Sequence, residues 1–143
     1  MTNTKTLHGE DGTTILETML IAGAALLLIG LLIAGIRISW AKGAVQEAAA
    51  AAARDGSLAR TAGQAQTNAN TAAAVSMSQS GASCVGQTVV LDTSRFLAPL
   101  GETGTIRATV SCTVPLANLV PGLPGSMDVS RSANSPVDPY RQR

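Results

Sequence analysis

The uncharged run TMLIAGAALLLIGLLIAGI, residues 18–36, decides the fold. It covers nineteen positions without an Asp, Glu, Lys or Arg. At the helical rise of about 1.5 Å per residue, these positions span roughly 29 Å, which matches the hydrocarbon core of a bilayer. The run therefore predicts a transmembrane helix, to which we assign residues 13–40.

Two other interpretations of this run compete with a membrane helix. A buried core helix rarely needs so long an uncharged run. A cleaved secretory signal would use Lys5 as its basic end and the small residues of SWA, 39–41, before its cut. Against this second interpretation, the run exceeds the roughly 7 to 15 apolar residues of a usual signal, and Arg37 closes it before the cut.

Length and composition limit what the rest of the chain can be. The chain has 143 residues, enough for one domain of ordinary size, and only Trp40, Phe96 and Tyr140 are aromatic. We therefore expect a small globular part. Ten Lys and Arg stand against nine Asp and Glu, so the charge balance indicates no basic patch for nucleic acid or for an anionic membrane surface.

Past the membrane run, an alanine-rich stretch predicts a helical stalk over residues 41–80. The segment AVQEAAAAAARDG, 44–56, is rich in helix formers, and Gly56 is expected to cap the helix at its C-terminal end. A second stretch, residues 57–77, is rich in Ala, Gln, Asn and Thr and is also expected to be helical.

Residues 81–132 change to a strand pattern. Apolar and polar residues alternate from Ile106 to Leu116, which predicts a half-buried strand with Cys112 on its core face. Residues 87–92 and 126–132 are shorter strand candidates, and the Pro-containing residues 133–143 are expected to form a flexible tail. The expected fold class is α+β: a long N-terminal transmembrane helix, a helical stalk and a small antiparallel β-region with one disulfide.

Two cysteines bear on the cellular compartment. Cys84 and Cys112 have no further Cys and no nearby His to form a zinc site, so a disulfide in an oxidising space is expected, with two buried thiols as the alternative. The basic residues indicate the opposite side of the membrane. Lys5 alone precedes the helix, whereas Arg37, Lys42 and Arg54 follow it, which by the positive-inside rule would place the C-terminal part in the cytoplasm.

A lone carboxylate stands at the start of the apolar run. In DGTTILETML, residues 11–20, a cut after Gly12 would make Thr13 the new N-terminus and Glu17 the fifth residue. This arrangement resembles the processing site of the type IV pilin superfamily. The resemblance implies that residues 1–12 are a leader, that a prepilin peptidase cuts between Gly12 and Thr13 on the cytoplasmic side, and that the C-terminal part lies outside.

Glu17 needs a partner if it enters the membrane. Charged residues in hydrocarbon are costly and usually pair inside an assembly. Cutting after Gly12 would create an α-amino group on Thr13, one helical turn before Glu17 or on a neighbouring subunit. The alternative is that Glu17 is solvated at the membrane surface and has no assembly role.

Small residues in the membrane run indicate how helices would pack. Gly23, Gly30 and Ala34 allow close approach of a second helix, and Gly30 with Ala34 forms a small-xxx-small pair. Glycine and alanine are also frequent in membrane helices in general, so this support for assembly is weak.

The order of these features is similar to that of the TadE family of pilin-like proteins from tight-adherence (Flp, type IVc) pilus systems. The resemblance implies a pseudopilin held in the cytoplasmic membrane, or in an extracellular pilus, whose partners are a prepilin peptidase, other pilin or pseudopilin subunits, an inner-membrane assembly platform and membrane lipid. A signal-anchored or secreted small binding module, without a filament role, is the alternative.

The sequence offers no set of residues for catalysis. His8, the only histidine, lies in the expected leader, and no Ser/His/Asp or Cys/His set, phosphate loop or metal cluster can be assembled from the remaining residues. We therefore expect no enzymatic activity, no cofactor, no metal and no nucleic-acid partner.

Overall fold

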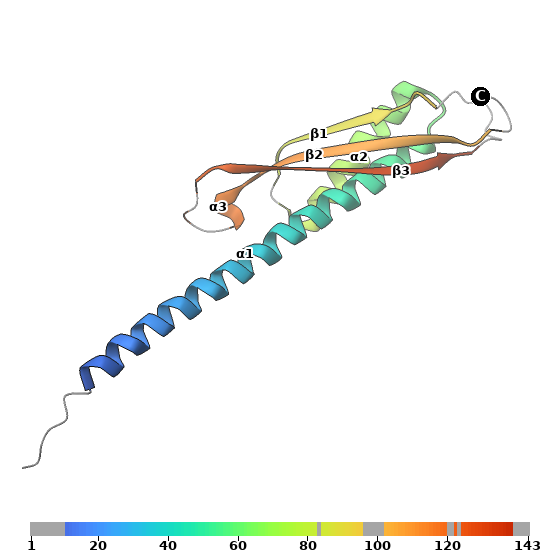
Figure 1. The fold of residues 1–143 in the computed structure, drawn as a ribbon. Helices are drawn as coiled ribbons and strands as arrows, with labels where there is room; N and C mark the ends of the chain where they lie inside the picture. The colour runs from blue at the N-terminus through green and yellow to red at the C-terminus, as the bar shows by residue number, and fades with distance from the viewer. Residues whose placement is uncertain (1–10, 83, 96–101, 120–121, 123, 139–143) are drawn as a thin grey trace, which may run out of the picture. The chain divides into compact units, whose positions relative to one another are not determined.

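The computed structural model describes residues 11–82, 84–95, 102–119, 122 and 124–138. Its elements follow one another as α1 (Asp11–Ser57), α2 (Ala62–Ser80), β1 (Val85–Asp92), β2 (Gly104–Pro115), α3 (Leu116–Leu119) and β3 (Ser126–Val137) (Figure 1). The chain divides into an N-terminal unit, Met1–Ile36, and a C-terminal unit, Arg37–Arg143. The fold class is α+β, as the sequence predicts.

The C-terminal unit contains a three-stranded antiparallel sheet with β2 at its centre, in the order β1-β2-β3 (Figure 1). Residues of β2 alternate between buried and more exposed, and Ile106, Val110 and Cys112 are almost completely buried. The strand predicted from the alternating pattern is therefore confirmed, with Cys112 on the core face. Across the ladder, Cys112 pairs with Val129 of β3.

Helices α1 and α2 cover the inner face of this sheet, and their contact surface is built largely from alanine. Ala48, Ala49 and Ala52 of α1 and Ala69 and Ala73 of α2 are fully buried in one cluster with the inner face of β2. Because alanine side chains end at Cβ, the helices and the sheet can approach closely. The alanine-rich stretch is thus the helical layer of the core.

Both ends of α2 follow from local chemistry. The Thr61 side chain accepts a hydrogen bond from the backbone N–H of Gln64, which caps the first turn. At the other end, Gly81 has a φ of 65°, a left-handed conformation that glycine adopts without a steric penalty. The helix predicted over residues 57–77 is therefore present with shifted boundaries.

Three details differ from the expectations. Gly56 does not end α1 but lies inside it, where a Cβ atom would come within 3.3 Å of Leu91; glycine lets the strand approach here. Strand β3 continues to Val137 instead of ending at Ser132, because its residues pair with β2 throughout. A short helix, α3, follows β2. Residues 139–143 of the expected tail lie outside the described residues.

Candidate functional site

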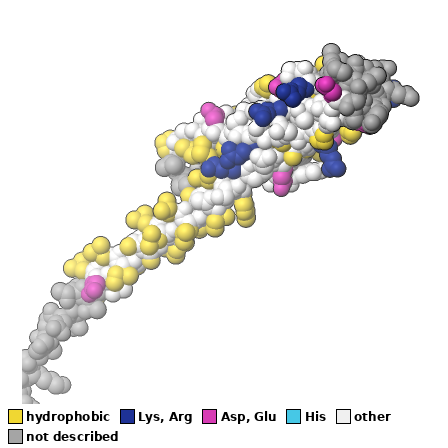
Figure 2. All heavy atoms as spheres, turned by 45° about the vertical axis from the view of Figure 1, so that its right-hand side comes forward, with side chains coloured by type: hydrophobic (Ala, Val, Ile, Leu, Met, Phe, Trp, Pro, Cys, Tyr) yellow, Lys and Arg dark blue, Asp and Glu magenta, His cyan; other side chains and the backbone are white. Residues whose placement is uncertain are grey.

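The N-terminal unit presents a helix that is apolar on its surface. Between Ile15 and Ile36 of α1, the large hydrophobic side chains are about half exposed or more, and Leu27 is 78% exposed. Hydrophobic side chains cover the visible side of this stretch (Figure 2). By length and composition this helix can cross a membrane. Such a helix near the N-terminus is typical of a signal-anchored membrane protein.

The residues expected at the processing site lie at the start of α1. The backbone of Gly12 and Thr13 is helical, and Glu17 follows one turn later with an exposed side chain. Helical spacing therefore places the Thr13 nitrogen and the Glu17 side chain on the same face. Cleavage between Gly12 and Thr13, and the pairing of Glu17 with the new amino group, stay predictions.

The small residues expected to pack helices are open in the single chain. A Cβ atom built on Gly23 or Gly30 would meet no atom within 4 Å, and Ala34 is partly exposed. The surface around these residues is thus accessible to a second helix. Their role in packing stays a prediction.

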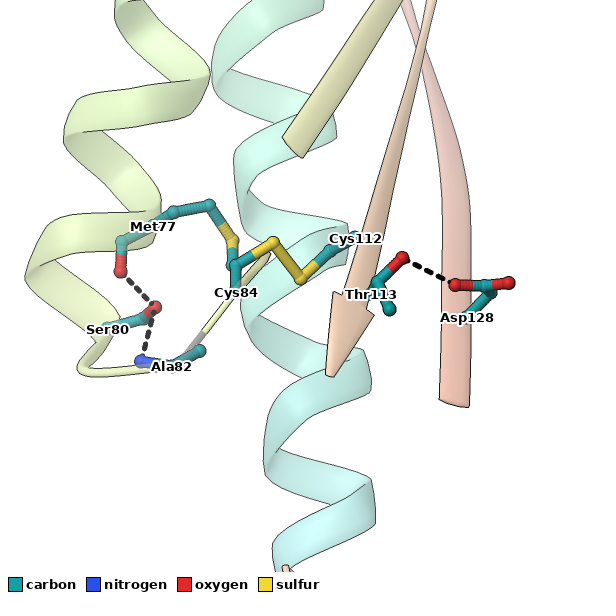
Figure 3. The surroundings of a disulfide bond; sticks show 7 residues. All are labelled: Met77, Ser80, Ala82, Cys84, Cys112, Thr113 and Asp128. Atoms are coloured by element: carbon teal, nitrogen blue, oxygen red, sulfur yellow. Dashed lines mark hydrogen bonds between the residues drawn. A yellow bond between two sulfur atoms is a disulfide. The ribbon is translucent and has the colours of Figure 1, made fainter. Parts of the chain in front are cut away.

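The disulfide lies where α2 meets the sheet. Cys84 and Cys112 are joined, with their Cα atoms 5.6 Å apart, beside the C-terminal end of α2 (Figure 3). At that end, the Ser80 hydroxyl donates to the Met77 carbonyl at 2.8 Å and accepts from the Ala82 N–H at 3.5 Å. The bond therefore ties the loop after α2 to the central strand.

Gly86 shapes β1, the strand that begins directly after Cys84. The pairing of β1 with β2 shifts between Val85 and Thr88, and Gly86 between them has a φ of 75°. This is the geometry of a β-bulge with a left-handed glycine. The bulge lets Cys84 reach Cys112 while the rest of β1 keeps its register with β2.

A groove that the sequence reasoning missed lies beside this loop. It has a volume of about 290 Å³. Its lining comes from several elements of the C-terminal unit: Arg37, Trp40 and Ala41 of α1, Ser80 at the end of α2, Gly81 and Ala82 after it, Val114 of β2 and Asn118 of α3. The sequence signal that could have found part of it is Arg37, directly after the apolar run, with Trp40 three positions later, a combination typical of a membrane surface.

A second, polar groove of about 260 Å³ lies at the other end of the β2 strand, around Asp92, Arg95 and Arg107. The backbone N–H of Ser94 donates to the Asp92 carboxylate at 2.9 Å. This hydrogen bond, together with one from the Ser94 side chain, lowers the pKa of Asp92 below its ordinary value. The carboxylate thus stays charged beside the two arginines.

The other face of the sheet is polar, and hydroxyl groups form side-chain hydrogen bonds between β2 and β3 on it. Ser111 donates to Ser130 at 3.0 Å, and Thr113 donates to the Asp128 carboxylate at 2.6 Å. Within the part of the chain that the structure describes, no three His, Cys, Asp or Glu side chains gather closely enough to hold a metal ion. The expected lack of enzymatic activity stays a prediction.

The described geometry has a long apolar N-terminal helix whose C-terminal part packs on a small disulfide-linked sheet. This is consistent with the architecture of type IV pilin-like proteins. No protein-family model matches the chain, and neither curated proteins nor solved structures give a significant match.

Proposed function

We propose that the chain is a pilin-like subunit of the TadE pseudopilin type, working in a tight-adherence (type IVc) pilus assembly system. A prepilin peptidase removes residues 1–12, and the apolar part of α1 then assembles with other pilin or pseudopilin subunits at an inner-membrane platform. The C-terminal unit lies outside the cytoplasmic membrane, where a disulfide can form and persist.

The observation that carries this proposal is the position of Glu17. It is the only charged residue between Asp11 and Arg37, and it lies at the start of the uncharged run, five residues after Gly12. A carboxylate at this place is costly in hydrocarbon unless a cation meets it. The amino group made by cleavage after Gly12 would be that cation, since it lies one helical turn away.

Two features of the C-terminal unit support the same proposal. The Cys84–Cys112 disulfide favours an oxidising space over the cytoplasm, against the orientation that Arg37 and Lys42 would favour. Alanine side chains bring α1 close to α2 and to the sheet, so the helix that would assemble also forms the core of the exposed unit. In this proposal, the helix that anchors the protein in the membrane is also the helix that holds the sheet outside it.

The mature N-terminus tests the proposal. The full chain is coexpressed with the cognate prepilin peptidase, and the membrane fraction is analysed by intact mass and N-terminal sequencing. We expect Thr13 as the first residue in the wild type and an uncut chain in Gly12→Val, because a side chain before the cut would not fit the peptidase. The matched control is Gly9→Val, which changes a glycine inside the leader and should still be cut after Gly12.

The other outcomes identify the competing functions. A mature chain that begins at Lys42 would indicate a secreted binding module, because the cut would follow the SWA residues. A chain that begins at Met1 or Thr2 in the presence of active peptidase would indicate a plain membrane anchor. Either result would contradict the pseudopilin proposal.

A further inference from the structure

The groove beside α3 combines one fixed cation with an apolar wall. A nitrogen of the Arg37 guanidinium donates to the backbone carbonyl of Asn118 at 3.0 Å. Trp40, one turn further along α1, is 74% exposed. Ala41, Ala82 and Val114 add apolar surface to the lining. The same groove is therefore lined by a hydrogen-bonded guanidinium, an indole and small apolar side chains.

The lining is complementary to an anion. Among the described residues that line the groove there is no Asp or Glu. A guanidinium has five N–H donors in a planar fork, and this fork matches the oxygens of a phosphate group. The hydrogen bond to Asn118 holds the guanidinium in place, so less side-chain entropy is lost when an anion binds.

The place of Arg37 in the sequence indicates where such an anion would come from. Arg37 directly follows Ile36, the last residue of the uncharged run, and Trp40 comes three positions later. In membrane proteins, tryptophan gathers at the level of the lipid headgroups, and arginine side chains near helix ends reach toward the same level. The phosphates of the lipid leaflet are thus the anions nearest to this part of the chain.

We propose that the groove binds the headgroup phosphate of one membrane phospholipid. Arg37 is the phosphate ligand, and the indole of Trp40 packs beside the glycerol region of the lipid. Ser80 at the end of α2 also lines the groove, together with Gly81 and Ala82 of the loop that the Cys84–Cys112 disulfide ties to β2. The inference depends on the apolar run crossing a membrane, but on neither leader cleavage nor filament assembly. A plain anchor would bind the lipid equally.

Lipid retention by the full chain tests this proposal. The purified protein in detergent is titrated with phosphatidylglycerol, and bound lipid is counted by native mass spectrometry. We expect the wild type to retain one phospholipid and Arg37→Gln to bind it roughly ten-fold more weakly, as expected for loss of a charge-assisted hydrogen bond. Arg60→Gln removes the same charge from an exposed position that does not line this groove, and it should bind like the wild type.

Two further variants separate phosphate recognition from general charge and from folding. Arg37→Lys keeps the charge but loses the planar fork, so we expect an intermediate loss of binding. Ala82→Leu keeps Arg37 and narrows the groove, so it should also lose the lipid. The circular dichroism spectrum and the disulfide of each variant show that it has folded.

Trp40 gives a second readout because it is the only tryptophan of the chain. In vesicles, a spin label at headgroup level should quench its fluorescence strongly. Equal retention of phosphatidylglycerol by the wild type and Arg37→Gln would overturn the proposal. Equal retention of diacylglycerol, which lacks the phosphate, or displacement of the lipid by millimolar inorganic phosphate would overturn it as well.

Discussion

The hydroxyl oxygens of Ser57 and Ser135 lie 3.0 Å apart and join the last residue of α1 to β3. Ser57 also donates to the Arg54 carbonyl at 2.7 Å. Because a hydroxyl group has one proton, Ser135 must be the donor to Ser57. The end of the long helix is thereby fixed to an edge strand of the sheet.

Removing this link should destabilise the C-terminal unit. In Ser57→Ala the Ser135 hydroxyl loses its acceptor, and we expect the free energy of unfolding to fall by about 1 kcal/mol. Urea denaturation of the full chain in detergent, followed by circular dichroism, measures the change. The control is Ser130→Ala on the exposed face, which should stay within about 0.5 kcal/mol of the wild type. Equal effects of the two variants would contradict the structural role of Ser57.

The alanine contact between the helices predicts a sharp difference between two neighbours. Ala73 is fully buried and Ala74 is exposed on the same helix. Ala73→Leu should lower the free energy of unfolding by roughly 1 to 3 kcal/mol, because the larger side chain forces the layers apart. Ala74→Leu, with the same change in propensity and volume, should be nearly neutral. Denaturation of both full-length variants measures the difference, and two neutral variants would contradict the close packing of α2.

The disulfide should contribute more to the free energy of unfolding than any single hydrogen bond does. Its cysteines are 28 positions apart, and in the chain-entropy model such a loop stabilises by roughly 3 to 4 kcal/mol. We expect reductant to lower the stability of the wild type by about this amount and to leave Cys84→Ser/Cys112→Ser unchanged.

Alkylation of intact cells, and then of reduced extract, shows where the bond forms. Both thiols should resist alkylation in denatured protein until reductant is added. Free thiols in unreduced, denatured protein would place the C-terminal unit in a reducing compartment and contradict the proposed orientation.

A substitution of Glu17 distinguishes a helix that assembles with other subunits from a helix that only anchors the protein in the membrane. If its carboxylate pairs with the Thr13 amino group, Glu17→Ala should be inserted and cleaved but should fail to assemble, because an ammonium group would be left unpaired near hydrocarbon. Crosslinking through single cysteines placed along residues 20–35 measures assembly in the wild type and the variant. Glu47→Ala, at an exposed position of α1 beyond the membrane run, is the control and should crosslink normally. An unchanged crosslinking pattern and normal pili in Glu17→Ala would contradict the pairing and would show that Glu17 is an ordinary surface charge.

The sequence predicted those helices and strands that have a clear pattern of apolar and polar residues within the element itself. The alternation from Ile106 onward identified β2, and the uncharged run identified the apolar part of α1. The end of β3 was missed because Ser135 and Pro136 are typical of loops, whereas pairing with β2 provides the ladder that holds them extended. Proline is tolerated there because β3 is an edge strand.

The groove could not be predicted for a different reason. The groove is lined by residues far apart in the chain, such as Arg37, Gly81 and Asn118. They come together only because α1, α3 and the loop that follows α2 pack against one another. The disulfide pairing was simpler to predict because the chain has two cysteines. Gly56 was assigned to a helix end because glycine favours that position, but the approach of Leu91 explains it better.

The buried alanines also determine how the C-terminal unit responds to temperature. The heat-capacity change of unfolding grows with the apolar area that becomes exposed, and alanine contributes little area per residue. Alanine also loses almost no side-chain entropy when it is buried. A core of this kind should have a broad, shallow stability curve, so warming and cooling around ambient temperature would change its free energy of unfolding only slightly.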